Sequence, residues 1–319
     1  MSIKTVLALA AIFIAGYCPR VFASPTTRPA WLDDDDNDDR KPAPATAATI
    51  PQSTRYFFGL LDTRSSYGND FFHDPLVGPD FDSERQIELD YTHSEASGFQ
   101  GNEVDGAFQW NVIGKLSVAA EFGYDWENQS NMPGGDGDDP PNQNSQGFEN
   151  VDLAVYHPFF QYVSQGGGFD YTAVLRLDVG IPTRTPQSGT DVQLTPYLGH
   201  LLRVGDHLSL EAWVGPQFTI APDQTNILLY GASFGYEIFH NQLPVPLTSL
   251  LTPIFELDGQ TPFSSGGQES LLGACGLDVG LPPVGDATTH VEIGYEFPID
   301  KGARDSLRSG VAAQIFLEF

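Results

Sequence analysis

The side chains best suited to chemistry are seven histidines and a surplus of carboxylates. The histidines are scattered, and none lies in a nucleophile motif with serine. His93 is next to Ser94, but adjacent residues of a strand point to opposite faces and cannot share a proton. No two histidines have the spacing of metal ligands. We therefore expect no enzyme activity, no resident metal and no cofactor. The histidines are His73, His93, His157, His200, His207, His240 and His290.

Two aspartate-rich stretches have the composition to attract calcium. Residues 33–39 hold six aspartates but lack the Gly and Glu placement of an EF-hand loop, so a solvated tail is the preferred interpretation. Residues 136–139 lie in a polar loop that could hold calcium loosely.

The carboxylates that follow alternate with apolar residues. Ile87, Leu89 and Tyr91 fall on one face of a strand, and Glu88 and Asp90 fall on the other. Each such strand therefore has one apolar and one polar face. The same alternation recurs in residues 115–126, 169–180, 290–297 and 309–319.

The whole C-terminal region follows this period of two, without a convincing helical period. The connections alternate between long polar loops, such as residues 127–147, and mostly tight turns, with residues 240–249 as a longer exception. This asymmetry is typical of a closed antiparallel transmembrane β-barrel with the long loops outside the cell. Twelve strands are expected, at about residues 84–94, 103–112, 115–126, 148–163, 169–180, 191–203, 207–219, 227–239, 250–258, 269–281, 288–298 and 309–319.

Bacterial barrels have even strand numbers, so the apolar stretch at residues 55–62 is placed outside the wall, in the periplasm or in the lumen. We expect a signal peptide at 1–23, because a short apolar run follows Lys4 and precedes small residues. Residues 24–83 are expected to be a flexible periplasmic or plug segment, acidic at its start. After cleavage only Cys275 remains, so no internal disulfide forms.

The net charge of the chain and its last strand indicate which partners the protein can bind. Because 42 acidic residues face 15 basic ones, the net charge of -27 excludes nucleic acid. The end "QIFLEF", with Phe319 at the membrane interface, looks like the C-terminal signal read by the barrel assembly machinery. The expected location is therefore the outer membrane of a Gram-negative bacterium, in contact with its lipid.

Several short motifs carry a family resemblance across residues 168–319. They are "RLDVGIPT", "QLTPYLG", "TPIFELDGQTP", "GACGLDVGLP" and "EIGYEFPI". In their order the chain resembles the outer-membrane channel family of the phenol-degradation MetA-pathway type. Residues 84–167 match only in strand pattern. The resemblance implies uptake of small, often apolar or aromatic molecules and identifies no catalytic residue.

The predicted function is a passive outer-membrane channel, a porin with a small-molecule substrate. The acidic excess on the polar face exceeds what internal pairing can use, which favours a cation-preferring passage. One alternative is a structural or adhesion barrel with a blocked lumen that binds partners through external loops, and another is a soluble periplasmic sandwich. The predicted pore-lining residues are Glu88, Asp90, Glu121, Arg176, Asp178, Glu211, Glu256, Glu292 and Glu296.

Overall fold

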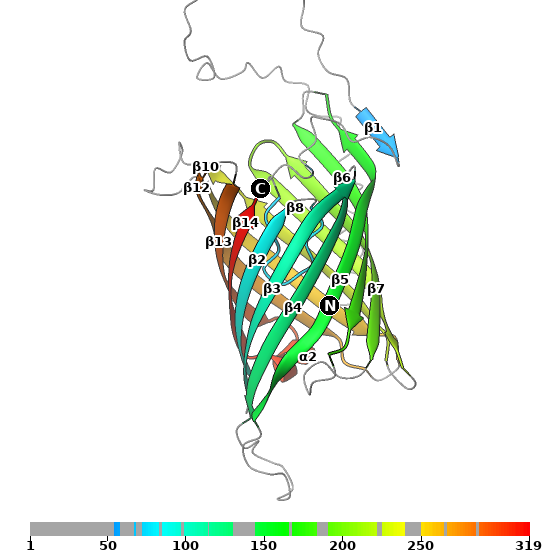
Figure 1. Cartoon of the computed structure of the whole chain (residues 1–319), viewed down its shortest axis with the longest axis vertical. Coiled ribbons are helices and arrows are strands. Elements are labelled where there is room, and N and C mark those ends of the chain that lie inside the picture. The colour runs from blue at the N-terminus through cyan, green and yellow to red at the C-terminus, as the bar shows by residue number, and fades with distance from the viewer. Residues whose placement is uncertain are drawn as a thin grey trace, which may run out of the picture. The chain divides into compact units, whose positions relative to one another are not determined.

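The protein is seen in a computed structural model as a tall β-barrel (Figure 1). No helix among the described residues is long and apolar enough to cross a membrane. The predicted signal peptide and both aspartate-rich stretches lie outside the described residues. Those residues are 54–57, 67, 72–82, 85–96, 99–113, 115–129, 144–165, 168–183, 191–221, 225–239, 250–264, 267–284 and 287–319.

Twelve long strands form the wall, and they confirm the predicted fold class. Alternating apolar and polar residues give each strand two different faces, and the strands extend a few residues beyond several predicted ends. They are β2 (Gln86–Ala96), β3 (Phe99–Ile113), β4 (Leu116–Gln129), β5 (Asn144–Val163), β6 (Phe169–Ile181), β7 (Val192–Val204), β8 (Leu208–Ile220), β9 (Ile227–Tyr236), β11 (Leu250–Pro262), β12 (Ser270–Val284), β13 (Ala287–Pro298) and β14 (Ser309–Glu318).

The wall is a meander in which each strand pairs antiparallel with the next along the chain. The sheet closes where the last strand meets the first, with Ile315 opposite Leu89 and Gln314 opposite Asp90. Closure leaves no free sheet edge in this ring, so the backbone groups of every wall strand have partners on both sides.

Polarity is inverted relative to a soluble protein. Large apolar side chains such as Leu89, Leu175 and Ile293 are 53%, 48% and 59% exposed on the outside. Polar side chains such as Gln161 and Ser209 are fully buried on the inside. An apolar exterior is stable only against lipid, and closed barrels of this kind span the bacterial outer membrane. The chain is an outer-membrane β-barrel.

Three short elements lie outside the ring of twelve strands. The strand β1 (Thr54–Phe57) pairs with the end of β5, and β10 (Ile238–Phe239) pairs with the start of β11. Both lie outside the twelve-strand ring, and residues 58–62 of the predicted apolar stretch lie outside the described residues. Helix α2 (Lys301–Ser306) connects β13 to β14 and begins where Asp300 accepts a hydrogen bond from the Ala303 amide at 2.8 Å. At six residues it is too short to show a helical period.

Candidate functional site

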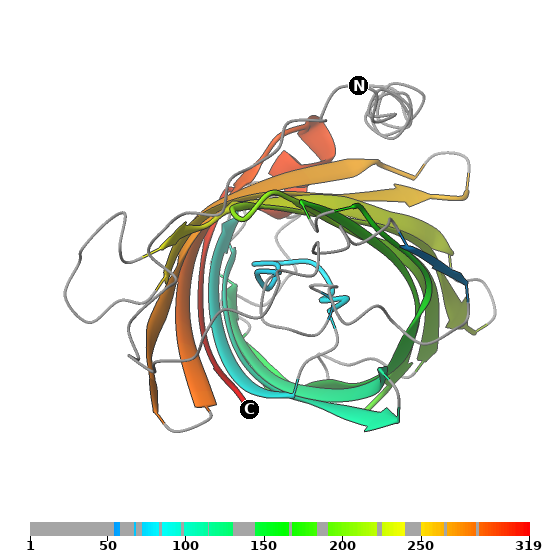
Figure 2. The same cartoon turned by 90° about the horizontal axis from the view of Figure 1, so that it is seen from above.

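The candidate site is the barrel lumen, which is crossed by residues 72–82, here called the plug (Figure 2). The plug precedes β2 and has no regular secondary structure. Within the described residues it pairs with no strand of the wall. Its attachment therefore depends on side chains, which come from both the plug and the inner face of the barrel.

One wall carboxylate holds the centre of the plug. Glu256 on β11 is fully buried, and its Oε2 accepts hydrogen bonds from the Leu76 amide at 2.7 Å and the Val77 amide at 3.3 Å. Its Oε1 accepts another from the Gly78 amide at 2.6 Å. A carboxylate that accepts several backbone N–H groups is a strong anchor for an otherwise unpaired loop.

An arginine and an amide hold the end of the plug. Arg176 on β6 donates to the Asp80 carbonyl oxygen and forms an ion pair with Asp178 at 2.7 Å. Gln109 on β3 donates to the Asp80 carboxylate and to the Asp82 carbonyl oxygen, both at 3.0 Å. Burial raises the pKa of the Asp80 carboxyl, while hydrogen bonds and the Arg176 charge oppose that shift.

Aromatic packing fills the space beside these bonds. Phe81 is fully buried, lies edge-on to Tyr197 at 6.0 Å and stacks near Trp213 at 6.4 Å between ring centroids. A Cβ on Gly199 would lie 2.2 Å from Phe81, so the absence of a side chain at that wall position makes room for the ring. Packing as well as hydrogen bonding therefore attaches the plug to the wall at this level of the lumen.

The sequence predicted no contact for His73, yet the structure brings it to two serines. Its ring nitrogens lie 2.8 Å from Ser209 Oγ and 2.5 Å from Ser233 Oγ. Burial lowers the pKa of His73 to about 4. Both ring nitrogens are used by hydroxyls, so no carboxylate orients the ring as a nucleophile–base–acid relay requires. The arrangement fastens the plug. Ser209 and Ser233 lie 136 and 160 residues from His73 along the chain, so no local sequence pattern could indicate these two contacts.

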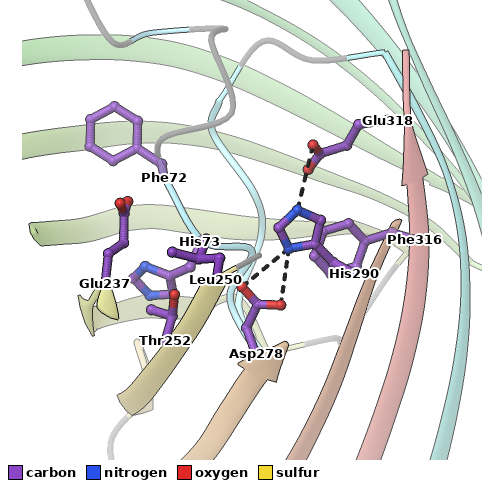
Figure 3. A pocket seen from close by; sticks show the side chains of 9 residues that line it. All are labelled: Phe72, His73, Glu237, Leu250, Thr252, Asp278, His290, Phe316 and Glu318. Atoms are coloured by element: carbon purple, nitrogen blue, oxygen red, sulfur yellow. Dashed lines mark hydrogen bonds and ion pairs between the residues drawn. The ribbon is translucent and has the colours of Figure 1, made fainter. Parts of the chain in front are cut away.

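A small cavity lies next to His73 (Figure 3). On its wall His290 lies 3.0 Å from Asp278 and 3.9 Å from Glu318, and it stacks on Phe316 with ring centroids 4.9 Å apart. The cavity volume of about 10 Å³ is at the lower limit for one water molecule. This space is too small for an organic ligand.

A larger cavity of about 180 Å³ lies on the inner side of β2, β3 and β4 and includes Glu103 and Asp125 in its lining. Near it, Glu103, Asp105 and Glu149 offer carboxylate oxygens within 4.8 Å of one another. No local pattern in the sequence indicates this trio, because Glu103 and Asp105 lie on β3 and Glu149 lies on β5.

The predicted pore-lining residues fall into different environments. Glu121 is exposed, although it belongs to the polar face of β4, so water reaches that part of the lumen. Glu88, Asp90, Arg176 and Asp178 are partly buried. Glu211, Glu256, Glu292 and Glu296 are buried, at 2%, 0%, 0% and 8% exposed. Whether any of the nine lines a conducting path stays a prediction.

Comparisons with known proteins give a likeness of fold. No family model and no curated protein sequence matches this chain. Among solved structures it is similar to an outer-membrane channel from Pseudomonas putida F1, at 11% identity and a TM-score of 0.45, covering 78% of this chain and 100% of that one. It is also similar to the NanC porin, at 11% identity and a TM-score of 0.44, covering 73% of this chain and 98% of that one. The KdgM porin is similar at 13% identity and a TM-score of 0.39, with coverage of 73% and 98%. These values concern the barrel fold alone, and the MetA-pathway type stays a prediction.

Proposed function

We propose that the chain is a passive outer-membrane channel for small molecules, and that the plug closes it in this conformation. The observation that carries the proposal is the mode of attachment. The plug is bound by side chains such as Glu256, Arg176 and Gln109, and it shares no sheet ladder with the wall in the described residues. Removing it would leave all twelve strand pairings intact, so the barrel can open without unfolding.

The inner face supports passage of polar or charged solutes. Glu121 is exposed inside the ring, and the cavity beside Glu103 and Asp125 adds solvent-accessible acidic surface. Carboxylates in a narrow passage with low-dielectric walls favour cations. Small molecules with apolar or aromatic parts are the substrate class that the family resemblance implies.

The second candidate is a structural or adhesion barrel with a permanently blocked lumen. It is favoured by the apolar contacts of the plug, in which Phe81 and Leu76 are 0% and 4% exposed and pack against the wall. Packing of this kind is ordinary for a fixed core, so conduction is the property that separates the two functions.

Planar-bilayer recording tests the proposal. The full chain should show low or intermittent conductance, and a variant lacking residues 24–83 should show a larger and steadier current with weak cation preference. That preference should fall at high salt. Barrels that are sealed both before and after the truncation would refute the channel and leave the structural function. Circular dichroism of both proteins verifies that each barrel is folded.

A further inference from the structure

The ring of Phe81 in the plug occupies a site built from residues of the barrel wall. The guanidinium carbon of Arg176 on β6 lies 5.8 Å from the centre of this ring. Tyr197 on β7 and Trp213 on β8 contact it edge-on and stacked. Gly199 on β7 gives the ring its space, since a Cβ there would lie 2.2 Å from it. Arg176, Tyr197, Gly199 and Trp213 are here called the ring site.

The wall also binds the peptide groups on either side of Phe81. Arg176 donates a hydrogen bond to the Asp80 carbonyl oxygen, and Gln109 on β3 donates one to the Asp82 carbonyl oxygen at 3.0 Å. Gln109 also donates to the Asp80 carboxylate at 3.0 Å. The wall therefore holds a benzyl ring between two amide carbonyls, which is the chemistry of a peptide with an aromatic side chain.

The ring site belongs to an apolar area on an inner face that also carries buried polar side chains. The cluster around Phe81 contains Val174 on β6 and Leu201 on β7, and both are fully buried. When the plug leaves, this apolar surface and the rings of Tyr197 and Trp213 face the water of the lumen, which is unfavourable. A solute with an aromatic ring would cover the same surface in place of Phe81.

The charges at the site favour a neutral solute over a free acid. Arg176 forms an ion pair through Nε with Asp178 at 2.7 Å, while its Nη1 donates to the Asp80 carbonyl oxygen. Its charge is already balanced by a carboxylate, so the Nη1 group suits an uncharged carbonyl acceptor. We propose that, once the plug is released, the ring site binds a solute with an aromatic ring next to an amide carbonyl, such as a short phenylalanyl peptide.

The plug is then a built-in competitor of the solute, because both occupy the same wall residues. A solute that binds only the released form shifts the equilibrium towards release, by a factor that rises with its concentration. This inference rests on the proposed function for the release of the plug. It requires no current through the barrel, so the two can fail separately.

Hydrogen exchange of residues 76–82 in the full chain in detergent tests the competition. The probe is N-acetyl-phenylalanyl-glycinamide, whose acetyl and glycyl carbonyls correspond to those of Asp80 and Asp82. It should accelerate exchange of the plug amides as its concentration rises, while the amides of the wall strands stay protected. N-acetyl-alanyl-glycinamide, which lacks the ring, should have no effect at the same concentrations.

Two variants that both loosen the plug separate competition from general loosening. Glu256→Gln weakens an anchor of the plug outside the ring site, so the probe should accelerate exchange by the same factor as in the wild type. Gly199→Ala fills the space of the ring for plug and probe alike. The probe concentration that gives the same acceleration should therefore rise roughly 5- to 150-fold, as an overpacking cost implies.

A third variant tests the site where Gly199→Ala fails to fold. Tyr197→Leu keeps a buried apolar side chain but removes the edge-on contact with the ring, so the required probe concentration should rise roughly two- to twelvefold. The matched control is Tyr295→Leu, because Tyr295 is 48% exposed on the outer face of the wall. It should leave the effect of the probe unchanged.

Unchanged exchange of residues 76–82 up to the solubility limit of the probe would overturn the proposal. Equal acceleration by the compound without a ring would also overturn it, as would equal effects of the probe in the wild type and Gly199→Ala, which would place the probe elsewhere. A barrel that passes no ion current but shows the expected competition would refute the channel and support the ring site.

Discussion

The anchor at Glu256 permits a quantitative test of how the plug is held. In Glu256→Gln one carboxylate oxygen becomes an NH₂ group. If the remaining oxygen keeps the amides of Leu76 and Val77, the NH₂ faces the Gly78 amide, which now lies 2.6 Å from a donor. One hydrogen bond is lost, and the other two lose their charge assistance.

The expected cost follows from these bonds. A hydrogen bond to a charged group contributes about 1.5–3 kcal/mol, and an unsatisfied buried donor costs about 1–3 kcal/mol. Because the plug can shift to relieve part of the clash, we expect about 2–4 kcal/mol less stability for the plugged conformation. Since about 1.4 kcal/mol corresponds to a factor of ten, the population of the released plug should rise roughly 30- to 700-fold.

Amide hydrogen exchange measures this population directly, because the amides of residues 76–78 exchange when the plug leaves its site. Their exchange should accelerate by that factor in Glu256→Gln, while the amides of the wall strands stay protected. Glu296→Gln is the matched control, since Glu296 is also buried and acidic but has no hydrogen bond to the plug among the described contacts. Unchanged exchange at residues 76–78 would refute the role assigned to Glu256.

Four further substitutions or conditions have defined outcomes. Arg176→Lys should cost about 1.5–3 kcal/mol of plug stability, because an ammonium cannot reproduce the planar contacts to the plug and the wall, and exchange of the plug amides reports the loss. Gly199→Ala should displace Phe81 at an overpacking cost of about 1–3 kcal/mol, seen as protease cleavage of the plug in a barrel that stays folded. Ile293→Arg should destabilise the barrel by roughly 2–4 kcal/mol in lipid, measured by denaturant unfolding in vesicles. His73 has a pKa lowered to about 4, so its contribution is complete above pH 6.5 and is lost as pH falls towards 4; the wild type should lose more plug protection over that window than His73→Asn.

The strands of the wall could be predicted from the sequence because the alternation of apolar and polar residues within each strand determines which side chains face outward. In β13, Glu292 and Ile293 differ by one residue, and strand geometry alone sends them to opposite faces, where they are 0% and 59% exposed. Closure also followed from local evidence, since the apolar face of β14 ends at Phe319 and requires lipid. The register that places Ile315 opposite Leu89 needed the structure.

The plug contacts could not be predicted, because they join residues far apart in the chain. Glu256 lies 180 residues from Leu76, and nothing near either residue indicates that a carboxylate of β11 would accept amides from an irregular segment. The sequence predicted Glu256 and Glu292 to be pore-lining because they share the polar face. A polar face has one pattern whether water or another part of the protein covers it, and alternation cannot separate the two.

The distribution of charge explains why a plug of this kind is compatible with opening. Strand ladders hold the wall, so the inner carboxylates are not needed for its closure and are free to bind something else. Glu256 accepts hydrogen bonds from backbone amides of the plug, whereas neither carboxylate oxygen of Glu292 has a hydrogen-bond partner among the described residues. A plug held only by apolar packing would leave a carboxylate such as Glu256 without hydrogen-bond donors in the closed conformation. A plug that presents backbone amides to Glu256 satisfies this carboxylate when the barrel is closed, and water satisfies it when the plug is released. The two conformations therefore need not differ greatly in free energy, as the proposed opening of the barrel requires.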